Sequence, residues 1–276
     1  MIKKIQIISI AAILMLFNAC TKDADVKLPV VEPKLVINSF ISPQDTMIKV
    51  EVTLSQPLYN NTNSGQYFYV TDATVQINDG VTTKTLVYNS TENYYSISSS
   101  QFPIIVGTTY FLTVSTPDGK NVNASTSIPA ANSTLTFTSH LVINSNQDST
   151  YSMEAKWDDA IGTLDYYRIT YYAKQYYSGD IDTTYYAQFS GNFSDEGNDG
   201  RSFIQNFEVY KTNSTGNSGE LYLVHASNEY YLFHTKLADA ANSGGPFSEP
   251  IQMYSNINGG HGIFGGFNQY KLQVFL

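Results

Sequence analysis

The sequence is poor in positive charge, and this shortage excludes one class of partner. Its 276 residues include 15 lysines and arginines against 24 aspartates and glutamates, which gives a net charge of −9 at pH 7. Only two of the cationic residues are arginines, Arg168 and Arg201, and no basic cluster occurs along the chain. Because proteins bind a phosphate backbone through clustered lysine and arginine side chains, the sequence argues against a nucleic-acid partner.

Cysteine is almost absent, and no hydrophobic run is long enough to cross a membrane. Cys20 is the single cysteine, so the chain forms no internal disulfide, and its length is sufficient to bury a core without one. The apolar stretch from Ile5 to Phe17 is interrupted by Gln6 and Ser9. A membrane-spanning helix needs about 20 apolar residues, so this stretch is too short to be one.

Common catalytic and metal-binding motifs are missing as well. Neither the H-E-x-x-H zinc motif nor the G-x-S-x-G nucleophile elbow occurs. We therefore expect a protein that is not an enzyme and that has no metal site and no cofactor. Carboxylates that come together only on folding are not detected by such motifs. The histidines form no tight i, i+4 pair; they are His140, His225, His234 and His261.

The glycine-rich string NGGHGIFGG, residues 258–266, matches the letters of a dinucleotide-binding motif but not its context. Such a motif requires a preceding strand, a following helix and an acidic residue about 20 positions on. Only ten residues follow Gly266, and their alternation predicts a final strand. We instead expect the glycines to allow positive-φ turns and close backbone approach, with Ile263 and Phe264 in the core before the last strand.

The N-terminus is typical of an exported lipoprotein. Two lysines precede the apolar run, and Asn-Ala-Cys follows it, which predicts a signal peptide over residues 1–19. Cys20 directly follows Ala19 in a sequence that resembles the lipobox of bacterial lipoproteins, whose cysteine is acylated. Two or more acyl chains anchor a protein stably, so we expect Cys20 to hold the chain at the outer membrane.

Residues 20–33 are predicted to form a tether between the anchor and the folded part. Lys22, Asp23 and Asp25 resemble the surface-export signal of Bacteroidota lipoproteins, and an ordinary solvated tether is the alternative. Both the cell surface and the periplasmic face therefore remain open as locations.

Composition and residue alternation predict an all-β fold. The chain has 22 tyrosines and a single tryptophan, and tyrosine and threonine favour strands. Apolar side chains alternate with polar ones over 46–55, and Asp79-Gly80 marks a hairpin. We expect an immunoglobulin-like β-sandwich over 34–130 and a second β-sandwich-like domain with one short helix over 131–276. Apolar residues at helical spacing predict that helix: Tyr230, Phe233, Leu237 and Ala241.

A tyrosine-rich strand is the candidate binding surface. Over 166–177, alternation places Tyr167, Ile169, Tyr171 and Ala173 on one face. The opposite face carries the tyrosines that would stack on a sugar or a peptide, unless they only cover the edge of the core. These candidate ligand-binding residues are Tyr166, Tyr172 and Tyr176.

Two acidic segments offer oxygen ligands without a recognised cation motif. The loop SDEGNDG contains Asp195, Glu196 and Asp199 but lacks the D-x-D-x-D-G order of a calcium loop. We interpret it as a solvated turn, and whether these residues bind a cation stays open. Asp158 and Asp159 with Asp165 are likewise interpreted as a turn.

Longer stretches of the chain resemble a known family. They are LVINSFISPQDTMIKVEVTLSQPLY, VTDATVQINDG, GTTYFLTVSTPDGKNVNASTSIP, DYYRI and GGPFSEPIQMYSNINGGHGIFGG. Together they are similar to a Bacteroidota lipoprotein family of unknown function, domain-of-unknown-function family 4249. The resemblance implies an envelope lipoprotein, often encoded beside a TonB-dependent transporter, and it brings no catalytic residues.

These observations favour a lipid-anchored accessory protein that binds a ligand or docks on a TonB-dependent outer-membrane transporter. The alternative is a surface carbohydrate-binding or adhesive module that uses exposed tyrosines to bind a glycan or a peptide. An enzyme with dispersed carboxylates is a third hypothesis.

Overall fold

The computed structural model describes residues 32–56, 67–143, 149–175, 184–210, 215–243 and 251–276. The signal peptide and most of the tether precede the first of these ranges. Five residues singled out in the sequence lie outside the described residues: Cys20, Lys22, Asp23, Asp25 and Tyr176.

Strands dominate the described part of the chain, so the predicted all-β, sandwich-like fold with one short helix is confirmed. The strands of the first half are β1 (Leu35–Ile41), β2 (Met47–Leu54), β3 (Thr74–Asn78), β4 (Thr83–Thr85), β5 (Val87–Asn89), β6 (Tyr94–Ser98), β7 (Thr109–Ser115) and β8 (Asn121–Ser127). The elements of the second half are β9 (Thr136–Ile143), β10 (Ser149–Asp158), β11 (Tyr166–Gln175), β12 (Thr184–Ser194), β13 (Ser202–Tyr210), β14 (Thr215–Ala226), the helix α2 (Asn228–Asn242) and β15 (His261–Phe275).

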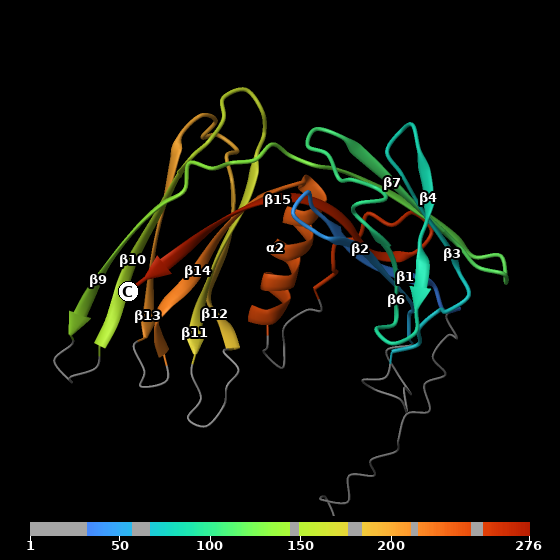
Figure 1. Ribbon diagram of the computed structural model, residues 1–276, viewed down its shortest axis with the longest axis horizontal. Helices are drawn as coiled ribbons and strands as arrows, with labels where there is room; N and C mark the ends of the chain where they lie inside the picture. Colours follow the sequence, from blue (N-terminus) through green and yellow to red (C-terminus); the bar gives the residue numbers. More distant parts are fainter. Residues whose placement is uncertain (1–31, 57–66, 144–148, 176–183, 211–214, 244–250) are drawn as a thin grey trace, which may run out of the picture. The chain divides into compact units, whose positions relative to one another are not determined.

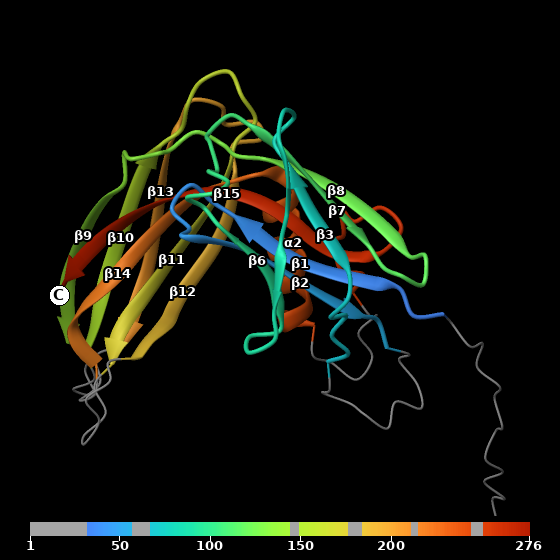
Figure 2. The same ribbon diagram turned by 45° about the vertical axis from the view of Figure 1, so that its right-hand side comes forward.

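The strands form three sheets (Figures 1 and 2). The largest has eight strands in the order β12-β11-β14-β15-β1-β2-β6-β5, and the others have the orders β13-β10-β9 and β4-β3-β7-β8. Neighbouring strands are antiparallel except at one junction, where β1 and β15 run parallel. The eight-stranded sheet therefore contains strands from both halves of the sequence.

Alternating side chains explain the core of the first half. In β2 the buried apolar residues are Ile48, Val50 and Val52, and in β3 they are Val75 and Ile77. Each set points to one face because successive side chains of a strand point to opposite faces. The same holds for Tyr110, Leu112 and Val114 of β7, and the alternation predicted over residues 46–55 is confirmed in β2.

The core of the second half surrounds the single tryptophan. The Trp157 side chain is fully buried at the end of β10, and its ring stacks on Phe203 of β13 with 5.1 Å between ring centroids. Phe193 and Tyr167 pack edge-on against the same indole, with centroid distances of 5.3 and 6.0 Å. The three-stranded sheet thereby packs its apolar side chains against those of β11 and β12.

The last strand belongs to both cores. Residues 261–266 of β15 pair with β1, and residues 267–275 pair with β14. Phe264 of this strand and Ile257, which precedes it, pack in the core of the first half. Both residues fall within 131–276, the predicted second domain, but they pack in the core formed by residues of the first half.

Close backbone approach is the reason for the glycines of this strand. Gly262 has φ of +105°, and a Cβ added there would lie 1.9 Å from the carbonyl oxygen of Ile37 in β1. The predicted use of these glycines is confirmed. Ile263 and Phe264 are buried as expected, but they lie within β15 rather than before it, because the strand begins at His261.

Ser227 caps the N-terminus of helix α2, and its hydroxyl accepts a hydrogen bond from the backbone N–H of Tyr230. Tyr230 is buried, whereas Leu237 is 48% exposed, so only the first part of the predicted apolar stripe packs against the sheet. No helix in the described ranges is both long and apolar enough to span a bilayer.

Candidate functional site

A pocket of about 430 Å³ lies on one face of the eight-stranded sheet, beside α2. Three adjacent strands and the helix supply its walls. Cross-strand pairing sets neighbouring side chains in rows: Tyr172 lies opposite Glu220, and Thr170 lies opposite Tyr222. The lining residues are Arg168, Thr170, Tyr172, Glu220, Tyr222, Val224, Tyr230, Phe267 and Gln269.

The tyrosine-rich strand has the two faces that its alternation predicts. Tyr167, Ile169, Tyr171 and Ala173 are buried in the core of the second half, so the prediction for that face is confirmed. The opposite face of β11 turns its side chains toward the pocket.

The predicted binding tyrosines do not all meet in this pocket. Tyr172 lines it, with its ring edge-on to Tyr222 at a centroid distance of 5.7 Å. Tyr166 lies outside it and stacks on Tyr231 of α2 at 4.8 Å. Tyr176 lies outside the described residues.

Opposite charges line two sides of the pocket. The guanidinium of Arg168 donates to the amide oxygen of Asn192 at 2.8 Å. The Glu220 carboxylate accepts from the Lys271 ammonium at 2.8 Å and from the Tyr222 hydroxyl at 2.6 Å. Burial raises the pKa of Glu220, but these two hydrogen bonds outweigh it and hold the pKa below its ordinary value.

The helix contributes a neutral phenol. Burial raises the pKa of Tyr230 to about 12, so its hydroxyl remains protonated at neutral pH. The pocket thus combines aromatic rings with hydrogen-bonding groups of both signs, which suits a polar ligand that also offers an apolar face.

Several pocket residues were missed in the sequence, namely Glu220, Tyr222, Tyr230 and Phe267. The alternation of GELYLVHAS places Glu220, Tyr222 and Val224 on one face of a strand. That signal was available, but it does not say which strand lies next to β14.

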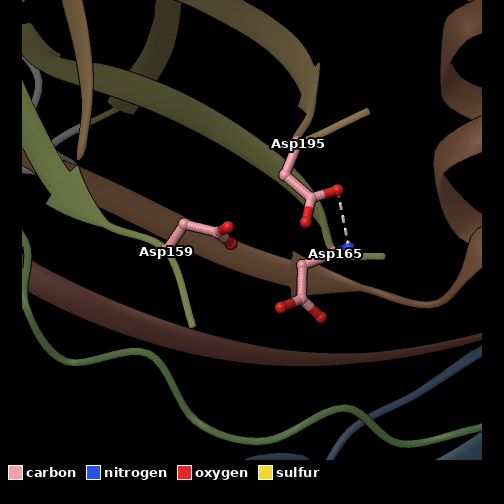
Figure 3. A group of neighbouring side chains, drawn as sticks. All are labelled: Asp159, Asp165 and Asp195. Carbon is pink, nitrogen blue, oxygen red and sulfur yellow. Dashed lines mark hydrogen bonds between the residues drawn. The ribbon is translucent and has the colours of Figure 1, made fainter. Parts of the chain in front are cut away.

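A second cluster of functional groups gathers three aspartates where three strands end. Asp159 directly follows β10, Asp165 directly precedes β11, and Asp195 directly follows β12. One carboxylate oxygen of each lies within 4.8 Å of the others (Figure 3). We call this cluster the aspartate triad.

The interpretation of both acidic segments as solvated turns is wrong for two members of the triad. Asp195 is 1% exposed and Asp165 is 7% exposed, so both are buried rather than solvated. Glu196 and Asp199 are exposed, as a solvated turn requires. The structure therefore separates Asp195 from its acidic sequence neighbours and groups it with Asp159 and Asp165.

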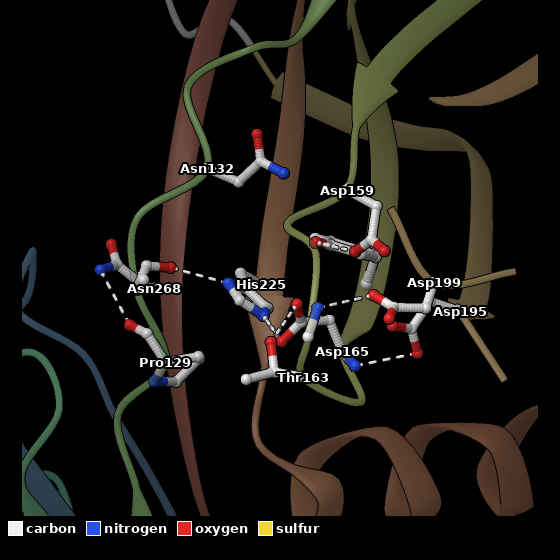
Figure 4. Close-up of polar contacts among 12 residues, drawn as sticks. Pro129, Asn132, Asp159, Thr163, Asp165, Asp195, Asp199, His225 and Asn268 are labelled. Atoms are coloured by element: carbon white, nitrogen blue, oxygen red, sulfur yellow. Dashed lines mark hydrogen bonds and ion pairs between the residues drawn. The ribbon is translucent and has the colours of Figure 1, made fainter. Parts of the chain in front are cut away.

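Hydrogen bonds hold the triad in place (Figure 4). Asp165 accepts from the Thr163 hydroxyl at 2.9 Å and lies 2.9 Å from Nε2 of the buried His225. Asp159 accepts from the Tyr167 hydroxyl at 2.7 Å and from the backbone N–H of Gly200 at 2.8 Å.

Asp195 is less well satisfied. Its Oδ1 accepts from the backbone N–H of Asp165 at 2.9 Å, while its Oδ2 is buried and has no hydrogen-bond partner among the described residues. Burial raises the pKa of this carboxyl above its ordinary value, because desolvation penalises the charged form.

Comparison with known proteins gives a family for the chain. A family model described as "Domain of unknown function (DUF4249)" matches residues 21–273. No curated protein sequence matches the chain.

Among solved structures, similar chains come from two crystal forms of a cytokine receptor complex. The chain titled "Cytokine receptor complex - Crystal form 1A" is 11% identical with a TM-score of 0.24, and the match covers 69% of this chain and 84% of that one. The chain titled "Cytokine receptor complex - Crystal form 2" is 10% identical with a TM-score of 0.23, and the match covers 70% and 90%.

Proposed function

Since the chain belongs to the domain-of-unknown-function family DUF4249, we propose that it is a non-enzymatic binding protein that is anchored in the outer membrane through acyl chains on Cys20. It holds a ligand in the sheet pocket and acts with a TonB-dependent transporter. The pocket between β11, β14, β15 and α2 is the observation on which the proposal rests.

The anchor is supported by the N-terminal sequence. Residues 1–19 have the layout of a signal peptide, and Cys20 follows Ala19 where acylation would occur. Lys22, Asp23 and Asp25 would direct export to the cell surface, and without such a signal the chain would remain on the periplasmic face. The transporter is proposed from the family resemblance alone.

Binding is supported by the chemistry of the pocket. Arg168 and Glu220 supply opposite charges, and Tyr172 and Tyr222 supply rings that are only half-buried. A volume of about 430 Å³ lies within the range of ligand sites of about 300–1,000 Å³.

The anchor and the partner are tested together by isolating the full chain from native outer membranes. We expect mass spectrometry to find acyl chains on Cys20 and a TonB-dependent transporter among the co-purified proteins. The Cys20→Ser variant should leave the membrane fraction, because the acyl chains supply the membrane affinity. Isolation of an unmodified Cys20 from the membrane fraction, or repeated isolation without a transporter, would refute the corresponding part of the proposal.

A carbohydrate-binding role is the second candidate, and the edge-on pair of Tyr172 and Tyr222 favours it. Tyrosine presents a flat apolar ring with a polar hydroxyl, which matches the apolar face and hydroxyl rim of a sugar. Arg168, Glu220 and Gln269 lie around these rings as hydrogen-bonding groups for the hydroxyls.

This role is tested on a glycan array with the Tyr172→Ala variant. We expect affinity for the bound glycan to fall about 30-fold, because a central aromatic side chain of a binding site contributes on the order of 2 kcal/mol. Tyr166→Ala is the matched control, since it removes the same side chain from the same face of β11 outside the pocket. Equal losses in the two variants, or no binding to any glycan by the unmodified protein, would remove this candidate.

A further inference from the structure

The aspartate triad brings three carboxylates together with little compensating charge. Oxygens of Asp159, Asp165 and Asp195 lie within 4.8 Å of one another. Among the described residues, His225 is the one basic side chain in ion-pair contact with any of them, and it contacts Asp165. Like charges at such distances repel strongly in a partly buried site.

Hydrogen bonds and a ring contact hold the triad together despite this repulsion. Asp165 and Asp195 exchange two hydrogen bonds, because the backbone N–H of each donates to an oxygen of the other residue. His225 is fixed in turn by the carbonyl oxygen of Ala130, 2.8 Å from its Nδ1, and its ring stacks on Tyr167. These contacts therefore keep the three carboxylates close together, although repulsion between their charges favours separation.

One carboxylate oxygen of the triad has no hydrogen-bond partner among the described residues, which indicates that a positively charged ligand is missing. The Oδ2 atom of Asp195, a residue that is only 1% exposed, is buried and has no hydrogen-bond partner among the residues that the structure describes. Figure 3 shows this second oxygen turned toward the space between Asp159 and Asp165. A buried acceptor left unpaired is destabilising by about 1–3 kcal/mol, and more when it is charged.

We propose that the aspartate triad binds a divalent cation, and that the cation is Ca²⁺. Carboxylate oxygens are the ligands that Ca²⁺ prefers, at about 2.3–2.6 Å. Three oxygens spaced evenly around an ion at about 2.4 Å lie about 4.2 Å apart, so oxygens within 4.8 Å of one another need only a small shift to reach such an ion. Mg²⁺ demands a near-ideal octahedron and keeps several of its waters, and Zn²⁺ prefers nitrogen and sulfur ligands, so both suit three protein carboxylates less well.

The surroundings of the triad suit this role. Asp159 lines a cavity of about 240 Å³ together with Tyr167 and His225, which offers an entry for the ion and room for water ligands. His225 and Thr163 each contact one oxygen of Asp165 and orient its carboxylate. A bound ion would tie the ends of β10, β11 and β12 together.

Calcium should stabilise the folded protein measurably. The full chain is purified in detergent, stripped with EDTA and melted with increasing CaCl₂. At 100 times the dissociation constant, mass action predicts a rise in melting temperature of about 5–10 °C for a chain of this size. Tb³⁺, a luminescent substitute for Ca²⁺, should show saturable emission excited through Tyr167, whose hydroxyl bonds Asp159.

Two variants separate a cation site from a general effect of acidic charge. Asp195→Asn keeps an oxygen for the Asp165 N–H and removes the unpartnered charge, so it should fold but lose both the Ca²⁺ response and the Tb³⁺ emission. Glu196→Gln removes the same charge from the exposed neighbouring position and should retain both.

Asp159→Asn provides a second test if Asp195→Asn fails to fold, and it should also lose both responses. A melting temperature of the unmodified protein that does not respond to Ca²⁺, without saturable Tb³⁺ emission, would overturn the proposal. Equal Ca²⁺ responses in the Asp195→Asn and Glu196→Gln variants would overturn it too.

Discussion

Replacing Gly262 by alanine is expected to destabilise the protein by more than about 4 kcal/mol, which is a large part of the 5–15 kcal/mol that stabilises a typical domain. The added Cβ would lie 1.9 Å from the carbonyl oxygen of Ile37 and 2.8–2.9 Å from its carbonyl carbon and amide nitrogen. Ile37 is the residue that pairs with Gly262 across the parallel junction, so the clash separates β1 from β15. Urea unfolding followed by circular dichroism measures the loss, and poor soluble yield would reflect the same effect.

Gly80→Ala is the matched control. Gly80 has a similar φ of +92°, but a Cβ added there would meet no atom within 4 Å among the described residues, its two chain neighbours aside. Its substitution therefore introduces only the strain of a left-handed backbone, roughly 1–2 kcal/mol. If the two variants lost the same stability, close approach to β1 would not be the reason for glycine at position 262.

Replacing Trp157 by alanine should cost about 3–5 kcal/mol of unfolding free energy, as is usual for a large aromatic side chain removed from a core. The side chain is fully buried and contacts Phe203, Phe193 and Tyr167, so its removal leaves a cavity at the point where β10, β12 and β13 meet. Equilibrium unfolding in urea measures the difference.

Trp157→Phe separates the loss of volume from the loss of the indole N–H. That N–H is buried without a hydrogen-bond partner among the described residues, so phenylalanine removes an unsatisfied donor while keeping an aromatic ring. We expect this variant to lose less than half as much stability as Trp157→Ala. Similar losses in the two variants would mean that the N–H has a stabilising partner.

Local patterns allowed the faces of the strands to be predicted. Alternation in β2 placed Ile48, Val50 and Val52 in the core, and alternation in β11 separated buried Tyr167 from Tyr172 of the pocket. Such predictions succeed because alternate residues of a strand point to opposite faces of the sheet, so the sequence alone tells which side chains share a face. The hairpin at Asp79-Gly80 succeeded for an equally local reason, because the turn requires a positive φ.

The partners of these strands could not be predicted in the same way. Nothing local to β15 shows that it pairs with β1, more than 200 residues earlier in the chain. The pocket could not be predicted without knowing which strands pair, since Glu220 and Tyr172 become neighbours only when β14 pairs with β11. The glycines of β15 indicated a close approach but not the strand that makes it.

The aspartate triad is the clearest case of this difference. The sequence showed Asp159 and Asp195 in separate turns and suggested that both were solvated. Exposure, however, depends on which turns come together at the ends of β10, β11 and β12. Helix α2 shows the same limitation, because its apolar spacing continues to Leu237 although packing against the sheet stops earlier.

The shared strand β15 also affects the order in which the chain acquires its structure. Until residues 257–266 have been synthesised, the core of the first half lacks Ile257 and Phe264, and β1 lacks its parallel neighbour. Pairing strands so far apart in sequence is slow, because a long loop must close before the contact forms. A nascent chain would meanwhile present β1 as an open edge, a template for pairing with other chains. Folding of the N-terminal half is therefore completed only after residues 257–266 have been made.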